Sequence, residues 1–304
     1  KRCSQRRKVE KELYRQAYLI IAHRYDETFK TLLRMLDRDE NDIYVHMDLK
    51  NKQFDADDCR NLIKKSGIYF TKRTSVTWGG YSQINSELIL LETATAHRKY
   101  NYYHLLSGQD LPIKSNNEIM NFFKKHQGAE FVAFDKETFD CDDRVRYFYP
   151  LQEMVGRNRK SLLGRISSAM TLFQKIAHLK RNAEIQFQKG PNWFSITDDL
   201  ARYVIKRKEW INKVFHDSIC CDEIFLQTMV INSMFADRIY QYAGTENTEE
   251  AAMRLVDWER GGPYVFKNED YSELLNSNMI FARKFDCQTD NNIVNKLYAK
   301  ERQR

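Results

Sequence analysis

The chain has 304 residues with 42% hydrophobic residues, 30% charged residues and a formal net charge of +7, which together indicate a folded globular protein rather than a disordered one. Its 11 glycines and 4 prolines are too few for a long flexible linker or a turn-dense β-barrel. The longest continuous apolar run covers residues 17–22, whereas a membrane-spanning helix needs about 20 residues, so we expect neither such a helix nor a signal peptide.

Strands and helices alternate along most of the chain. Residues 1–16 are strongly basic and are expected to form a lead-in to the folded domain. Residues 17–22 are continuously apolar, which is typical of a strand buried on both faces. Further strands are predicted at 42–47, 67–70, 102–106 and 130–134, and helices at 26–36 and 82–96. This order predicts one α/β domain over residues 17–304, with a mostly parallel central sheet flanked by helices.

Polar and aromatic residues follow the predicted strands, where an open α/β sheet binds its ligands. They are His23, Asp48, Ser75 to Trp78 and Ser107 to Asp110. The sequence lacks the glycine-rich motifs of dinucleotide-binding and P-loop proteins, and no Asp-x-Asp pair closes an early strand. If a phosphorylated donor binds, we therefore expect side-chain cations rather than a divalent metal to neutralise it.

Seven segments, taken in order, resemble one enzyme family. The resemblance rests on Tyr18–His23, Ile43–Asp48, Val76–Gly80, Tyr103–Lys114, Gly190–Thr197, Asp222–Thr228 and Phe281–Asp286. They are similar to the core 2 / I-branching β-1,6-N-acetylglucosaminyltransferases and the related peptide xylosyltransferases. The resemblance implies a GT-A-like fold, a UDP-sugar donor, inversion at the anomeric carbon and no metal requirement. It also implies a nucleotide-binding half near residues 17–115 and an acceptor and catalytic half near residues 116–304.

Glu223 is the candidate catalytic base. An inverting transfer needs a carboxylate that takes the proton of the attacking hydroxyl, held in line with the leaving diphosphate. An acid near a helix start often serves only the helix dipole, but the family's catalytic glutamate falls in the same Asp-Glu-aromatic context. The neighbouring Asp222 is interpreted as a helix-start carboxylate.

The resemblance also nominates donor-binding residues. Arg254 and Lys284 are expected to hold the diphosphate in place of a metal, with Arg283 as an alternative; the competing interpretation is that they are surface cations. Asp48 and Trp78 are expected to contact the nucleoside, although Trp78 also suits core packing. Ile21 would line the base pocket, whereas structural roles are favoured for His23 and His46.

The acceptor side is expected near Ser107, Asp110, Arg146 and Trp193. The turn from Ser107 to Asp110 falls where the family's acceptor loop begins, and Arg146, with Arg144 beside it, falls near family positions that contact acceptor sugar. Trp193 suits either a platform for a sugar ring or core packing. The expected acceptor is a glycan or a lipid-linked saccharide of a surface polysaccharide or glycoconjugate.

Six sparse cysteines without metal-type spacing predict reduced thiols in a cytoplasmic enzyme, and they set the chain apart from the cysteine-rich animal members. We therefore expect a bacterial homologue.

Residues 157–181 carry seven cations and no acid, with apolar residues at helical spacing. Such a segment is typical either of a helix on the inner face of an anionic membrane or of an ordinary surface helix.

Other functions remain open at this stage. The same family includes xylosyltransferases, so UDP-xylose or another UDP-sugar is the main alternative to UDP-N-acetylglucosamine. The basic excess and the 13% aromatic content would also suit a nucleic-acid-binding protein, but no recognised nucleic-acid motif is present. An inactive sugar-nucleotide-binding module is a further alternative.

Overall fold

The computed structural model describes residues 14–135, 141–241 and 250–302, so most of the expected basic lead-in lies outside the described residues. Within them the chain forms a six-stranded sheet in the order β3-β2-β1-β4-β7-β6 and a three-stranded sheet in the order β5-β9-β8. The strands are β1 (Gln16–Ala22), β2 (Asn41–Met47), β3 (Gly67–Phe70), β4 (Tyr102–Ser107), β5 (Asp110–Pro112), β6 (Phe131–Val132), β7 (Phe194–Ile196), β8 (Arg254–Val256) and β9 (Phe281–Arg283).

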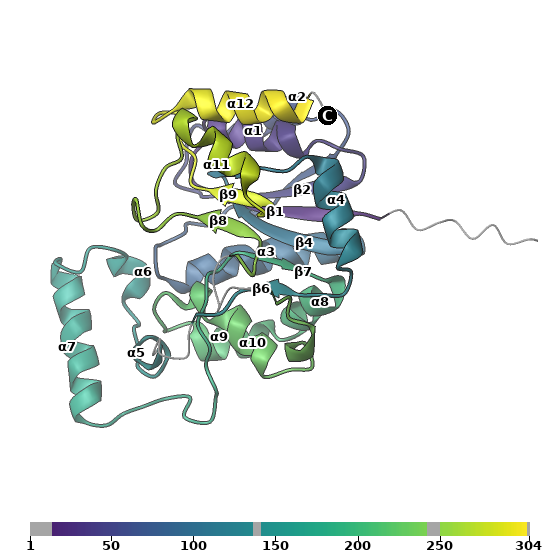
Figure 1. Ribbon diagram of the computed structural model, residues 1–304. Helices are drawn as coiled ribbons and strands as arrows, with labels where there is room; N and C mark the ends of the chain where they lie inside the picture. Colours follow the sequence, from purple (N-terminus) through teal and green to yellow (C-terminus); the bar gives the residue numbers. More distant parts are fainter. Residues whose placement is uncertain (1–13, 136–140, 242–249, 303–304) are drawn as a thin grey trace, which may run out of the picture.

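The central sheet is mostly parallel, as predicted. β1 pairs in parallel with both β2 and β4, and β3 extends the sheet in parallel beyond β2. β7 is antiparallel to its neighbours β4 and β6, a feature that the sequence did not indicate. The α/β class with a mostly parallel central sheet is therefore confirmed (Figure 1).

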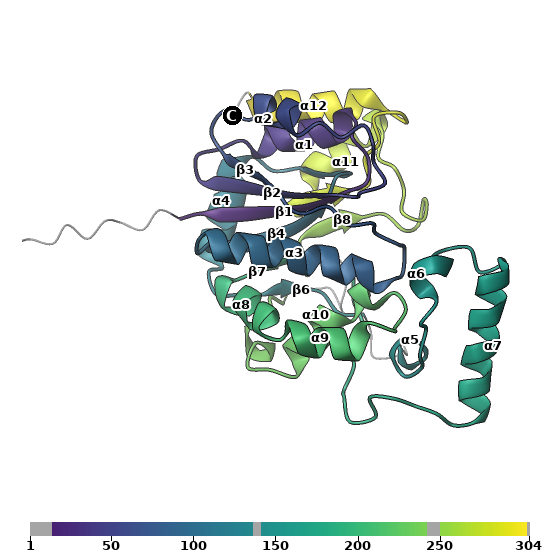
Figure 2. The same ribbon diagram turned by 180° about the vertical axis from the view of Figure 1, so that it is seen from behind.

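Helices cover both faces of this sheet, because successive β1 side chains point to opposite sides. Tyr18 and Ile20 belong to one buried cluster, whereas Ala17 and Leu19 belong to the other. α1 and α12 lie over the first cluster, and α3 and α8 lie on the opposite face (Figures 1 and 2). The helices are α1 (Glu27–Leu36), α2 (Ala56–Leu62), α3 (Tyr81–His97), α4 (Asn116–Lys125), α5 (Asp142–Val145), α6 (Gln152–Val155), α7 (Leu162–Ile176), α8 (Asp198–Lys206), α9 (Lys208–Phe215), α10 (Phe225–Ile231), α11 (Tyr271–Asn276) and α12 (Asn291–Arg302).

The small sheet joins distant parts of the chain. β5 follows directly on β4, yet its antiparallel partner β9 comes from the C-terminal part, with Asp110 opposite Arg283. β8 then adds in parallel to β9. This pairing brings the C-terminal segment around Lys284 to the edge where β1 and β4 end.

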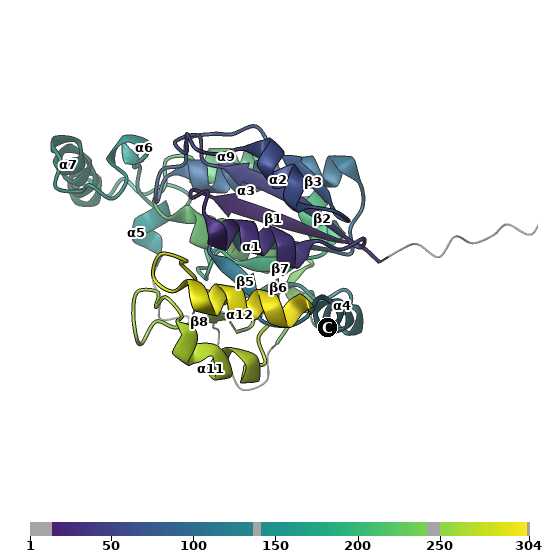
Figure 3. The same ribbon diagram turned by 90° about the horizontal axis from the view of Figure 1, so that it is seen from above.

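One helix stands away from the rest of the molecule. Seen from above, α7 lies beyond α5 and α6, outside the layers that cover the sheet (Figure 3). We call residues 157–181, which contain α7, the basic arm. Among the described residues, no helix has both the length and the apolar character required to cross a membrane.

Candidate functional site

The carboxyl ends of β1, β2 and β4 meet at one edge of the central sheet. Ile21 near the end of β1 is paired with His46 on one side and Ser107 on the other. Asp48 follows β2, and its backbone N–H donates to the carbonyl of Ala22 at 2.8 Å. Ile21 is half-buried and Asp48 is buried except for a small exposed fraction, so both border this edge as the sequence predicted.

His46 lies inside the sheet. Its Nε2 accepts from the backbone N–H of Thr74 at 3.2 Å and lies 2.9 Å from the Thr74 hydroxyl, the kind of contact expected of a structural histidine. Burial lowers the pKa of His46, so the ring is neutral near pH 7. His23, in contrast, is exposed.

The loop before α3 presents Trp78 to solvent. Its side chain is 45% exposed, so it is not packed in the core. The Arg157 guanidinium lies 5.1 Å from the centre of the Trp78 ring, within the range of a cation–π contact. The exposed ring and the cation beside it form a surface on which a planar, negatively charged ligand could stack.

The segment that carries Glu223 packs directly against this loop. The Cys220 backbone N–H donates to the Gly79 carbonyl at 2.9 Å. Gln83 in the first turn of α3 donates from Nε2 to Asp222 Oδ2 at 2.8 Å. These two bonds keep Glu223 on the loop adjoining that of Trp78.

Glu223 ends a short 3-10 helix, Cys221–Glu223, and its side chain is 39% exposed. Its Oε2 accepts from Arg144 Nη1 at 2.6 Å and lies 3.8 Å from Lys189 Nζ. Lys189 also forms an ion pair with the Asp135 carboxylate. Two cations thus fix the orientation of a carboxylate that solvent, and hence a hydroxyl substrate, can reach.

Asp222 points the other way, into the protein. Burial and the neighbouring charge of Glu223 raise the pKa of Asp222 to about 7. Burial together with Asp222 also raises the pKa of Glu87, which is fully buried in α3. The two adjacent acids therefore lie in different environments: Glu223 faces solvent, whereas Asp222 and Glu87 form a buried acidic pair.

Positive charge gathers around Lys284, which follows β9. Burial lowers the pKa of Lys284, and the positive charges of Arg24, Arg283 and Arg157 lower it further. Arg24 also donates to Asp286 Oδ2 at 2.7 Å. Arg157 thus contacts Trp78 and acts electrostatically on Lys284, and the group as a whole can attract a diphosphate.

Arg254 does not belong to this exposed group. It is 1% exposed, and its nitrogens donate to the carbonyls of Ala252 (2.6 Å), Leu105 (3.2 Å) and Phe194 (2.9 Å). Burial lowers the pKa of Arg254 to about 9. The enclosed guanidinium excludes the alternative of a surface cation, whereas the expected contact of Arg254 with the diphosphate stays a prediction.

Three of the expected acceptor residues form one interlocked group. Asp110 is buried, and it accepts from the Ser107 backbone N–H at 2.8 Å and from the Ser107 hydroxyl at 2.6 Å. Arg283 lies 3.3 Å from Asp110, and its guanidinium lies 4.2 Å from the centre of the Trp193 ring. Trp193 is only 8% exposed, so it is mostly packed and presents little ring surface.

Arg146 binds within its own neighbourhood. Its Nε donates to Asp142 at 3.0 Å and its Nη2 to the Ile185 carbonyl at 3.1 Å, and it also donates to the Asn182 carbonyl. Arg146 therefore joins the segment before the basic arm to the segment after it. Its neighbour Arg144 instead contacts Glu223.

Within the described part of the chain, one group of three side chains has atoms close enough to share a metal ion: Asp26, Asp286 and Cys287. Asp26 accepts from the Phe29 backbone N–H as the cap of α1, and Asp286 is paired with Arg24. Both carboxylates thus have structural partners, and the group lies apart from Glu223 in the sequence and in its contacts.

Comparison with known proteins identifies the family of the chain. The family model for the Core-2/I-branching enzymes matches residues 16–279. The chain belongs to this family. Similar members include the human N-acetyllactosaminide β-1,6-N-acetylglucosaminyl-transferase, 23% identical over 90% of this chain and 68% of its own length. Rat xylosyltransferase 2 is 20% identical over 93% of this chain and 33% of its own length.

Membership makes the protein a glycosyltransferase of the Core-2/I-branching family, and it implies a nucleotide-sugar donor and a glycan acceptor. Among solved structures, mouse xyloside xylosyltransferase 1 is similar over 91% of this chain and 98% of its own, with a TM-score of 0.37 and 10% identity. The family resemblance inferred from the seven segments is confirmed.

Sequence reasoning missed several charged residues at this edge. Arg24 lies two residues past the end of β1, a position that could have drawn attention to it. Lys189 carries no sequence signal of its own, and Arg157 stands out in the sequence only as the first cation of residues 157–181, because both reach the site through the folding of distant segments. The sequence places Arg144 near the acceptor, whereas in the structure it contacts Glu223.

Proposed function

We propose that this Core-2/I-branching enzyme transfers N-acetylglucosamine from UDP-N-acetylglucosamine to a hydroxyl of a glycan or lipid-linked saccharide, with inversion and without a metal. The observation that carries the proposal is the exposed Glu223 carboxylate, held by Arg144 and Lys189 on a segment bonded to the Trp78 loop. A proton acceptor and a stacking surface thereby border the same edge of the sheet.

In this proposal, Glu223 takes the proton of the acceptor hydroxyl as that oxygen attacks the anomeric carbon. The bond from that carbon to the diphosphate oxygen breaks on the opposite face, and UDP leaves with the bonding electrons. Lys284, with Arg157 and Arg24 nearby, stabilises the negative charge that develops on the diphosphate. Asp48 and Ile21 border the uridine, and Trp78 stacks on its base.

On the acceptor side, the proposal retains Trp193, Ser107, Asp110 and Arg146 as residues that shape the binding surface. Their side chains are bonded or packed within the chain, so they would act by fixing loops rather than by forming many direct bonds to sugar. The six cysteines are sparse and lack the spacing of a disulfide scaffold, so we place the site of action in a reducing compartment such as the cytoplasm.

UDP-xylose is a second candidate donor, because xylosyltransferases stand among the relatives at nearly the same identity as the N-acetylglucosaminyltransferases. A panel of UDP-sugars, scored by UDP release with a glycan acceptor present, separates the two. Release from UDP-xylose in preference to UDP-N-acetylglucosamine would replace the first donor with the second.

Replacing Glu223 with Gln should remove the proton acceptor while keeping the size of the side chain. We expect the transfer rate to fall at least about 100-fold, because general bases contribute rate factors of that order, whereas the Kd for UDP stays near that of the unchanged protein. Transfer is measured by product formation and UDP binding by calorimetry. Asp222→Asn is the matched control, since it changes the adjacent buried acid and should keep most of the activity. Wild-type turnover by Glu223→Gln would refute Glu223 as the base.

Removal of divalent metals tests the role of the cations. Because side chains rather than a metal are proposed to balance the diphosphate charge, transfer should continue unchanged after dialysis against EDTA. The assay compares the initial rate with EDTA, with added Mg²⁺ and with added Mn²⁺. A rate that vanishes with EDTA and returns with either metal contradicts the metal-independent mechanism.

A further inference from the structure

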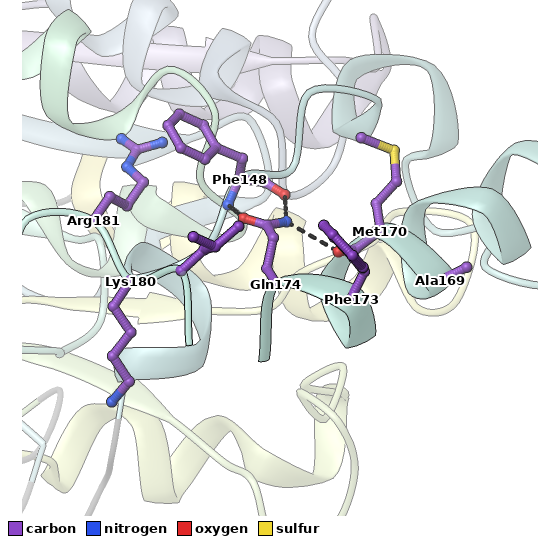
Figure 4. Close-up of a pocket in the computed structure, with 8 residues that line it drawn as sticks. Phe148, Ala169, Met170, Phe173, Gln174, Lys180 and Arg181 are labelled. Carbon is purple, nitrogen blue, oxygen red and sulfur yellow. Dashed lines mark hydrogen bonds between the residues drawn. The ribbon is translucent and has the colours of Figure 1, made fainter. Parts of the chain in front are cut away.

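The basic arm contains a helix whose burial pattern is inverted. The side of α7 that is buried against the protein carries the small or polar residues Gly164, Ser167 and Gln174. Gln174 holds the helix in place, because its Oε1 accepts from the Phe148 backbone N–H at 2.8 Å and its Nε2 donates to the Phe148 carbonyl at 3.1 Å (Figure 4). An ordinary surface helix buries its apolar side chains instead.

The outward face of α7 is a stripe of large apolar side chains. Leu162, Ile166, Phe173 and Ile176 follow one another at helical spacing and are 75%, 42%, 65% and 70% exposed. An open pocket of about 700 Å³ lies beside this helix, lined mainly by apolar side chains such as Phe148, Met170 and Phe173 (Figure 4). A contiguous apolar surface of this kind indicates an interaction with another apolar phase or molecule.

The residues around the apolar stripe are positively charged, which favours an anionic partner. The chain has no acidic residue between Glu153 and Glu184, and seven cations lie in that interval. Some of them are engaged within the protein, as Lys175 is with Asp143, but Arg159, Lys160 and Arg165 are exposed at the start of the arm. A second copy of the chain would bring like charges together, whereas an anionic surface would attract them.

We propose that the basic arm docks the protein onto a bilayer containing anionic phospholipid. The apolar stripe of α7 would lie at the boundary between headgroups and acyl chains, and Arg159, Lys160 and Arg165 would lie among the lipid phosphates. Since Arg157 at the start of the arm contacts Trp78, docking would place the edge of the sheet beside the membrane, where a lipid-linked acceptor resides.

Vesicle co-sedimentation of the full chain tests this directly, without donor or acceptor, so its outcome is independent of the proposed transferase reaction. The unchanged protein should bind vesicles rich in phosphatidylglycerol, whose headgroups make the surface anionic, and should bind pure phosphatidylcholine vesicles at least about tenfold more weakly. High salt should weaken the binding, because the attraction between the exposed cations and the lipid phosphates is screened.

Two variants separate the contributions of charge and apolar contact. Replacing Arg159, Lys160 and Arg165 together with Gln should weaken binding to the anionic vesicles about tenfold or more, and replacing Leu162, Phe173 and Ile176 with Gln should do the same. All six side chains are at least partly exposed on the arm, so the fold should persist, as circular dichroism would verify. The matched control replaces the exposed Lys64, Lys65 and Lys72, which flank β3 outside the basic arm, with Gln and should bind normally.

Absence of binding to anionic vesicles at low salt overturns the proposal, as does equal binding by both arm variants and the unchanged protein. The proposal would also be overturned if the protein did not bind vesicles but formed a concentration-dependent dimer that the Leu162, Phe173 and Ile176 substitutions dissociate. The partner of the apolar stripe would then be a second copy of the chain.

Discussion

Arg254 shows how the same residue type can serve either a ligand or the fold. Its guanidinium crosses from the small sheet to the carbonyls of Leu105 in β4 and Phe194 in β7, and it lies 4.5 Å from the centre of the Phe281 ring. A buried charge that satisfies several backbone oxygens is costly to remove, because those oxygens lose their donors in a medium without water. Arg254 therefore links the two sheets.

Replacing Arg254 with Met should lower the free energy of unfolding by about 2–4 kcal/mol, since several buried carbonyls lose a donor. The Kd for UDP should be unchanged in the folded fraction. Lys284→Met is the matched comparison: because Lys284 is only half-buried, its loss should weaken UDP binding with little loss of stability. Urea unfolding and calorimetry with UDP measure both quantities. If the Arg254→Met protein were stable but no longer bound UDP, Arg254 would be a diphosphate-binding residue.

At the scale of elements, the sequence predicts those that are long or continuously apolar. The strand predicted at 17–22 is β1 (Gln16–Ala22), and the strand predicted at 67–70 is β3 (Gly67–Phe70). The strand predicted at 130–134 shrinks to β6 (Phe131–Val132). The strands β5, β7, β8 and β9 were not predicted, because three residues are too few to show a period.

The same limit applies to the candidate site and to α7. Asp48 and Trp78 could be nominated because they follow predicted strands, and Glu223 because it lies in a recognisable segment. The contact of Arg144 with Glu223 depends on how separate segments pack, which no local pattern contains. The helical period in residues 157–181 predicted a helix, yet it could not tell that the apolar face of α7 would point outward.

At the scale of the whole molecule, buried acids and buried histidines change the stability of the fold with pH in opposite directions. Burial raises the pKa values of Glu130 and Asp222 to about 7. Their protonated forms fit the folded state better, so the stability that they contribute is lost as the pH rises toward 7. Burial lowers the pKa values of His46 and His104, and their contribution is lost as the pH falls below about 6.5. Because these effects oppose each other, the pH dependence of the total stability does not test any one pKa. A substitution that removes a single ionisable group is needed.

Replacing Asp222 with Asn isolates one such group, because Asn keeps the shape and can still accept from Gln83 but cannot ionise. Because burial and Glu223 raise the pKa of the Asp222 carboxyl from 3.8 to about 7, the unchanged protein should lose stability relative to Asp222→Asn as the pH rises from about 4 to 7. At pH 7.5 the variant should gain about 1–4 kcal/mol over its relative stability at pH 4.5, since each pKa unit corresponds to about 1.4 kcal/mol. Urea unfolding of both proteins at the two pH values measures this difference. A difference that does not change with pH would show that Asp222 is ionised and well solvated in the folded protein, and the buried acidic pair with Glu87 would then have to be abandoned.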